Sequence, residues 1–83
     1  MEPVKVHLWS GLRSFTDGQD VVEVDARNIG EMLAALEVKY PGLAPVIEAG
    51  VSVSIDGRII AFGLREAVSP DNEIYLMQRI KGG

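Results

Sequence analysis

The stretch Asn28-Ile29-Gly30-Glu31-Met32-Leu33-Ala34-Ala35-Leu36-Glu37-Val38-Lys39-Tyr40-Pro41-Gly42 decides the fold, because it predicts the main helix of the chain. Its apolar residues recur at helical spacing and form one stripe: Ile29, Met32, Leu33, Leu36 and Tyr40. Asn28 and Glu31 resemble a capping box at the start of this helix. Pro41-Gly42 predicts its end. A helix with a single apolar stripe needs another layer to cover that stripe.

Segments in which apolar and polar residues alternate lie on both sides of the helix, as is typical of strands with one buried face. These segments are 4–9 and 21–24 before the helix, and 51–55, 58–61 and 74–77 after it. Asp56-Gly57 predicts a two-residue hairpin turn. The single helix separates two hairpin-like groups, so the last strand can run parallel to the first at the sheet centre. This order predicts an α+β domain with a mixed four- to five-stranded sheet packed on one main helix.

Four apolar residues in the connecting segments are expected to pack beneath the sheet or to anchor a loop: Leu12, Phe15, Leu64 and Val68. His7 falls on the polar face of the first strand, and Ser52 and Ser54 fall on the polar face of the third. No base lies beside the serines in the sequence pattern, so we interpret Ser52 and Ser54 as surface residues rather than nucleophiles. His7 is a lone histidine on a strand, and we interpret it as a surface residue as well.

Composition excludes several classes of function. The 83 residues form one domain and include no cysteine, which rules out disulfides and thiolate chemistry, and one histidine cannot build a histidine-rich metal site. The net charge is −4 and the eight basic residues are scattered, which argues against nucleic-acid binding. No apolar run is long enough for a membrane span, and the N-terminus lacks a signal pattern. We therefore expect a cytoplasmic protein with no stably bound cofactor.

The sequence ends in Gln78-Arg79-Ile80-Lys81-Gly82-Gly83. We predict a folded body at residues 1–77 and a flexible C-terminal tail at 78–83. Glycine lacks a Cβ, so Gly82-Gly83 can pass through a narrow channel and present an unhindered carboxylate. Six extended residues reach about 20 Å, which is enough to enter the cleft of a partner. Arg79 and Lys81 either pair with acidic groups on that partner or serve ordinary solubility.

Three large side chains are candidates for a docking surface on the body. Tyr75 and Met77 alternate with the inward-facing residues of the last strand, and Trp9 ends the polar face of the first strand. Exposed aromatic and methionine side chains suit a surface that meets more than one partner. Trp9 is either such an interface anchor or is covered by the loop that follows it.

The whole chain resembles the MoaD/ThiS family of ubiquitin-like sulfur carriers. The resemblance rests on Val4-Lys5-Val6, Gly11-Leu12-Arg13, Ile29-Gly30-Glu31-Met32-Leu33, Lys39-Tyr40-Pro41-Gly42-Leu43, Ile55-Asp56-Gly57, Pro70-Asp71-Asn72-Glu73-Ile74 and Gly82-Gly83. It implies a β-grasp, or ubiquitin-like, roll. It also implies that the protein is no enzyme by itself but the substrate of an E1-like adenylyltransferase, and that it can act as the small subunit of a synthase.

The resemblance implies a specific role for the terminal residue. An E1-like enzyme uses ATP to adenylate Gly83, and a persulfide sulfur donor then yields a C-terminal thiocarboxylate. The acceptor is an enzyme such as the large subunit of molybdopterin synthase or thiazole synthase. The length, the loop after the first strand and Tyr40-Pro41 look like the small subunit of molybdopterin synthase. Residues 78–81 lack the prolines that this subunit often carries, and they look closer to the thiamine-pathway carrier.

Two other classes of function stay open from the sequence. A ubiquitin-like protein modifier would use the same activated Gly83 to form isopeptide bonds with lysines on target proteins. A non-covalent β-grasp interaction module would not need the terminal glycines. The three classes differ in what Gly83 becomes after activation: a thiocarboxylate, a conjugate, or an unaltered carboxylate.

Overall fold

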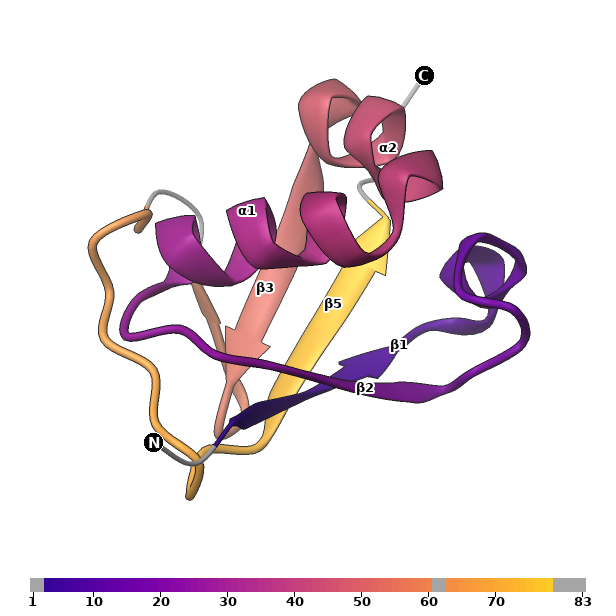
Figure 1. The fold of residues 1–83 in the computed structure, drawn as a ribbon. Helices are drawn as coiled ribbons and strands as arrows, with labels where there is room; N and C mark the ends of the chain where they lie inside the picture. The colour runs from indigo at the N-terminus through magenta and orange to yellow at the C-terminus, as the bar shows by residue number, and fades with distance from the viewer. Residues whose placement is uncertain (1–2, 61–62, 79–83) are drawn as a thin grey trace.

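The computed structural model describes residues 3–60 and 63–78, which form one five-stranded sheet with helix α1 packed across one of its faces (Figure 1). The strands are β1 (Val4–Leu8), β2 (Val21–Val24), β3 (Val51–Ile55), β4 (Arg58–Ile60) and β5 (Ile74–Gln78). The helices are α1 (Ile29–Lys39) and α2 (Ala44–Ala49), with 3₁₀ helices η1 (Ser10–Phe15) and η2 (Pro41–Leu43). The predicted main helix and five strands are confirmed.

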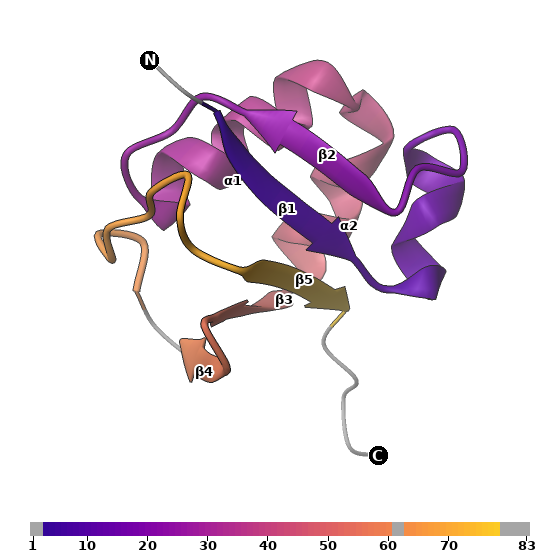
Figure 2. The ribbon, with the colours of Figure 1, turned by 90° about the horizontal axis from the view of Figure 1, so that it is seen from below.

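The strands lie in the order β2-β1-β5-β3-β4, and Figure 2 shows the sheet from below. The central strands β1 and β5 are parallel, with Val6 opposite Ile74 and Leu8 opposite Leu76. The other neighbouring strands are antiparallel. A parallel pair needs a long crossover, and here the segment containing α1 supplies it between the two hairpins. This is the β-grasp topology, so the predicted α+β class is confirmed.

Helix α1 begins at Ile29 because the side chain of Asn28 caps it. Asn28 Oδ1 accepts a hydrogen bond from the backbone N–H of Glu31 at 2.8 Å. The Glu31 carboxylate accepts a bond from the backbone N–H of Arg27 at 2.9 Å. The return bond of the predicted capping box therefore falls one residue before the N-cap.

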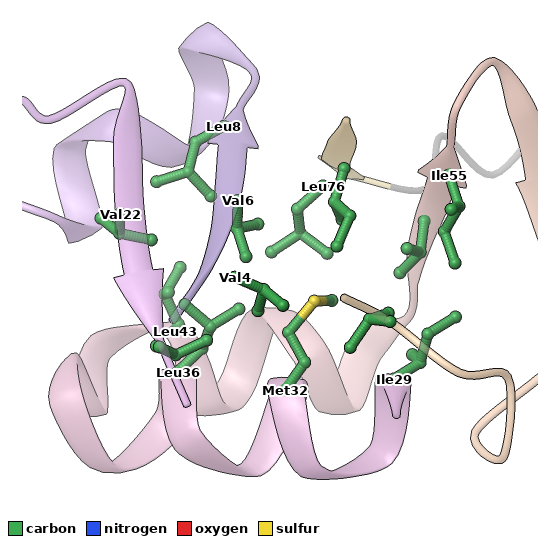
Figure 3. Packing of buried hydrophobic residues seen from close by; sticks show 14 of the residues in the cluster. Val4, Val6, Leu8, Val22, Ile29, Met32, Leu36, Leu43, Ile55 and Leu76 are labelled. Carbon is green, nitrogen blue, oxygen red and sulfur yellow. The ribbon is translucent and has the colours of Figure 1, made fainter. Parts of the chain in front are cut away.

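The apolar stripe of α1 packs against the inward face of the sheet (Figure 3). The side chains of Met32 and Leu36 meet Leu76 and its neighbours with no exposed surface at any of the three residues. Burial of one such side chain stabilises a fold by about 1.5–3 kcal/mol. The buried apolar residues are Val4, Val6, Leu8, Leu12, Val22, Val24, Ile29, Met32, Leu36, Leu43, Val53, Ile55, Val68, Ile74 and Leu76.

The loop between β4 and β5 is anchored differently from the prediction. Val68 is buried as expected, but Leu64 is 65% exposed, so its predicted role as an apolar anchor is wrong. The loop contacts α1 through its backbone instead, because the N–H groups of Ile29 and Gly30 donate to the carbonyls of Glu66 and Leu64 at 3.0 and 2.8 Å. These bonds satisfy first-turn groups of the helix without burying the Leu64 side chain.

The connection between β1 and β2 also differs in one detail. Leu12 of η1 is fully buried as predicted, whereas Phe15 remains 39% exposed. Phe15 lies against Gly42, where a Cβ would come within 3.4 Å of its ring. Its ring therefore packs on the surface of η2 rather than beneath the sheet.

Candidate functional site

The face of the sheet opposite α1 carries a row of side chains that crosses all five strands. The strand registers place five residues side by side from β2 to β4: Val21, His7, Tyr75, Ser54 and Ile59. Laterally paired residues of neighbouring strands point to the same face of a sheet. Since the adjacent residues of each strand face the core, these five line the opposite face, and we call them the open-face row. Ser54 is buried, with only 9% of its surface exposed, so its prediction as a surface residue is wrong. Its small side chain lies between the larger Tyr75 and Ile59, which leave it little contact with solvent.

The centre of the open-face row is aromatic and its ends are aliphatic. The rings of His7 and Tyr75 stack with centroids 4.7 Å apart and an interplanar angle of 23°. Ile59 at one end is 69% exposed, and Val21 at the other end is 37% exposed. Exposed apolar side chains gathered on one face of a small protein are candidates for an interaction surface.

Trp9 and Met77 extend this surface toward the end of β5. The Trp9 N–H donates to the Leu76 carbonyl at 3.2 Å, which continues the parallel β1–β5 ladder. Because Leu8 pairs with Leu76, Trp9 lies alongside Met77 at the next position. Trp9 is 51% exposed, so the following loop does not cover it. The structure thus brings together Trp9, Tyr75 and Met77, and their role in partner binding stays a prediction.

Tyr75 also interacts with an acidic neighbour two residues before it. The Glu73 carboxylate, within hydrogen-bonding reach of the Tyr75 hydroxyl, raises the pKa of Tyr75 above its ordinary value of 10.0. The hydrogen bond to Glu73 favours the protonated phenol, and the negative charge of Glu73 disfavours the phenolate. The hydroxyl is therefore held as a neutral donor throughout the physiological range of pH.

Replacing Glu73 by Gln is expected to lower the pKa of Tyr75 toward 10.0, because the charge that disfavours the phenolate is removed. The pKa of Tyr75 is higher in the folded protein than in the unfolded protein, so the folded state holds the phenolic proton more tightly. This contribution to stability is fully present at pH values below the unfolded pKa, and it is lost as the pH rises through the folded pKa. Stability at neutral pH is thus unaffected by this titration. Absorbance at the phenolate band, followed against pH in a Tyr40→Phe background, measures the shift. An unchanged midpoint in Glu73→Gln would contradict the assigned cause.

The predicted tail begins at the last residue of β5. Gln78 pairs with Val51 of β3, so the described chain ends beside the start of β3. Residues 79–83 lie outside the described residues, and the predictions for Arg79, Lys81, Gly82 and Gly83 therefore stay predictions.

Two members of the open-face row were missed by the sequence reasoning, Val21 and Ile59. Each is half of a doubled apolar pair, Val21-Val22 and Ile59-Ile60. Because neighbouring residues of a strand face opposite sides, one member of such a pair has to point away from the core. This signal in the sequence was sufficient to find both residues.

Within residues 3–60 and 63–78, no three or more His, Asp or Glu residues are grouped as a metal site requires. Over the same ranges, neither α-helix has the length and apolar character needed to cross a membrane.

Comparison with known proteins agrees with the fold. The model of the ThiS family matches residues 6–83. Small archaeal modifier protein 1 of Methanosarcina acetivorans is similar, with a TM-score of 0.82 and 28% identity over 100% of this chain and 98% of that chain. CysO of Amycolatopsis orientalis, solved in complex with BexX, gives a TM-score of 0.79 and 22% identity over 96% and 99%. A search of curated protein sequences found no significant match.

A third structure shows how widely the fold is shared. The complex of subunits 1 and 2 of the Helicobacter pylori molybdopterin-converting factor matches with a TM-score of 0.70 and 18% identity, over 98% of this chain and 99% of that chain. At this identity the similarity concerns the fold alone. The family match, by contrast, spans nearly the whole sequence. This protein therefore belongs to the ThiS family of small β-grasp carrier and modifier proteins.

Proposed function

We propose that this protein is a sulfur carrier whose Gly83 carboxylate is adenylated by an E1-like enzyme and then converted to a thiocarboxylate. The observation that carries the proposal is the family match, which extends through Gly82-Gly83 to residue 83. The absence of cysteine from the sequence is compatible with it, because the sulfur is carried on the backbone terminus.

The proposed chemistry needs two steps. The terminal carboxylate has a pKa near 3.5 and is an anion at pH 7, so it is a poor electrophile. It attacks the α-phosphate of ATP, pyrophosphate leaves, and the acyl carbon of Gly83 becomes reactive. The terminal sulfur of a persulfide then attacks this carbon and AMP leaves. A second thiol of the donor reduces the resulting acyl disulfide, which releases the thiocarboxylate and leaves a disulfide on the donor.

The open-face row and its Trp9–Met77 extension are proposed to dock on the activating enzyme while the tail enters its active site. Replacing Met77 by Glu places a charge among apolar groups and is expected to lower kcat/KM for adenylation about 10- to 100-fold. The kcat at saturation is expected to change little, because Met77 binds rather than reacts. ATP–pyrophosphate exchange with the native activating enzyme measures both constants.

Leu64→Glu is the matched control for this variant. Leu64 is 65% exposed and lies on the loop that contacts α1, away from the open-face row. The Leu64→Glu substitution also places a negative charge at an apolar residue. Its kcat and kcat/KM for ATP–pyrophosphate exchange are therefore expected to equal those of the unaltered protein. Equal kinetics for both variants would remove Met77 from the docking surface.

The acceptor is proposed to be the large subunit of molybdopterin synthase, with thiazole synthase as the alternative. The segment Lys39-Tyr40-Pro41-Gly42-Leu43, which forms the α1–η2 junction, supports the first because it looks like the small subunit of that synthase. The protein is first activated with ATP and a persulfide donor, and its intact mass is expected to show one oxygen exchanged for sulfur. Each acceptor enzyme is then added together with its substrate. Only the true acceptor is expected to remove the sulfur and return the intact mass to its original value.

A second candidate function is covalent modification of other proteins. It is favoured by the 28% identity to small archaeal modifier protein 1 over the full length of this chain. The same activation experiment separates the two functions when carried out in a cell extract. Conjugates of higher mass that contain Gly83 in an isopeptide bond would favour the modifier, and free thiocarboxylate would favour the carrier.

A further inference from the structure

Strand β2 forms one edge of the sheet, and part of its backbone faces outward. The Leu8 N–H donates to the Asp20 carbonyl at 2.8 Å, which makes Leu8 and Asp20 a hydrogen-bonded pair of the antiparallel β1–β2 ladder. Hydrogen-bonded and non-hydrogen-bonded pairs alternate along such a ladder. The backbone N–H and C=O groups of Val21 and Glu23 therefore point away from β1, toward the free edge.

Two hollows lie along this edge, and both are lined by Glu23 and Lys39. The first has a volume of about 820 Å³, lies between β2 and α1, and is also lined by Pro3, Val24, Asp25, Ala35 and Val38. The second has a volume of about 380 Å³ and is also lined by Lys5, Gln19, Val21 and Val22. Val38 is 83% exposed, although it is a large apolar residue in the last turns of a helix. The first hollow thus has an exposed apolar wall.

Lys39 covers part of the outward-facing backbone of β2. Its ammonium donates to the Glu23 carbonyl at 2.9 Å, one of the outward backbone groups of β2. A lysine that covers the backbone of an edge strand opposes unspecific pairing with other strands. Lys5 and Lys39 are two of the three lysines of a protein with net charge −4, and both line the second hollow. Their positive charge is complementary to an acidic side chain on an incoming segment.

We propose that the β2 edge binds an extended segment of a partner protein by strand addition. The segment alternates apolar and acidic residues, so that an apolar side chain enters the α1–β2 hollow against Val38. An acidic side chain on its other face lies by Lys5 and Lys39. A backbone N–H of the segment replaces the Lys39 ammonium on the Glu23 carbonyl, and the displaced ammonium pairs with the acidic side chain. This is recognition by an added strand, with specificity from alternate side chains.

The β2 edge shares only Val21 with the open-face row, which is the proposed docking face for the activating enzyme. Strand β1 lies between β2 and β5, so an added strand leaves the exit of β5 free. A second copy of the chain is a poorer occupant than a partner segment. Each copy carries a net charge of −4, and both Lys39–Glu23 bonds would have to break in one pairing event.

The probe is a capped octapeptide with the sequence Val-Glu-Val-Thr-Val-Glu-Val-Thr, added to the ¹⁵N-labelled full chain. Amide shift changes are expected to centre on Val21, Glu23 and Val38. The glutamate peptide is expected to bind about two- to fivefold tighter than the same peptide with lysines. Four results would overturn the proposal: no shift changes, equal or tighter binding of the lysine peptide, changes centred on His7, Tyr75 and Ile59, or concentration-dependent changes at β2 without peptide, which would indicate a second copy.

Two substitutions at exposed positions test the two halves of the proposal. Val38→Glu is expected to weaken binding of the glutamate peptide at least about fivefold, because a charge enters the apolar hollow and repels the peptide. Its control is Ala34→Glu, one turn earlier on an exposed part of α1, which is expected to bind the peptide normally. Lys39→Gln is expected to bring the ratio of the affinities for the glutamate peptide and the lysine peptide toward one. An unchanged preference, or equal losses in both glutamate variants, would overturn the assignment.

Discussion

Deletion of Gly83 is expected to abolish thiocarboxylate formation while leaving the melting temperature of the β-grasp body unchanged. The deletion moves the terminal carboxylate back by one residue, or about 3.5 Å along an extended chain. Misplacement of a reacting group by about 1 Å can lower a rate about 100-fold. A shift of one residue is therefore expected to lower ATP–pyrophosphate exchange by at least about 100-fold. Intact mass after incubation with the activating enzyme, ATP and the persulfide donor measures the product.

Gly83→Ala is the matched control for chain length. It restores the position of the carboxylate and adds only a methyl group, so it separates reach from the need for glycine. We expect activity between those of the deletion and the unaltered protein, because a Cβ at this position narrows the passage through a channel. Normal thiocarboxylate formation by the deletion variant would contradict the proposed function. Strand addition at the β2 edge should persist in the deletion variant, so the failures of the two proposals are distinguishable.

The helix and the strand pattern could be predicted from the sequence because their signals are local. Asn28 and Glu31 lie three residues apart and form the expected cap, and the stripe from Ile29 to Leu36 faces the sheet. The parallel pairing of β1 with β5 is less local, since Val6 meets Ile74 across most of the chain. Its prediction depended on the family resemblance as well as on the single crossover helix.

Other features required the three-dimensional structure. The His7–Tyr75 stack depends on the register of two strands far apart in sequence. The hydrogen bond between Lys39 and Glu23 joins the end of a helix to an edge strand, and no local sequence pattern predicts it. Leu64 shows the opposite limitation. Its apolar character suggested burial, but the backbone of its loop already satisfies the start of α1 and the side chain stays in solvent.

Leu64 provides the comparison for the second large prediction, which concerns Leu76. Leu76 lies in the central strand β5 with no exposed surface, and its replacement by Ala removes buried methyl groups and leaves a cavity. Such substitutions lower the free energy of unfolding by about 2–5 kcal/mol. Leu64→Ala deletes the same atoms at a position that is 65% exposed, and it is expected to change this free energy by less than about 0.5 kcal/mol.

The size of this loss decides whether Leu76→Ala is still folded. Domains are stable by about 5–15 kcal/mol, and an 83-residue domain is expected near the lower end of that range. Urea unfolding followed by circular dichroism measures both variants against the unaltered protein. Because β5 also carries Tyr75 and Met77, adenylation of Leu76→Ala by the proposed activating enzyme is expected to fall in proportion to the unfolded fraction of the variant. It is expected to recover when a stabilising osmolyte reduces that fraction. Equal unfolding free energies for the two alanine variants would show that the core does not depend on the central strand.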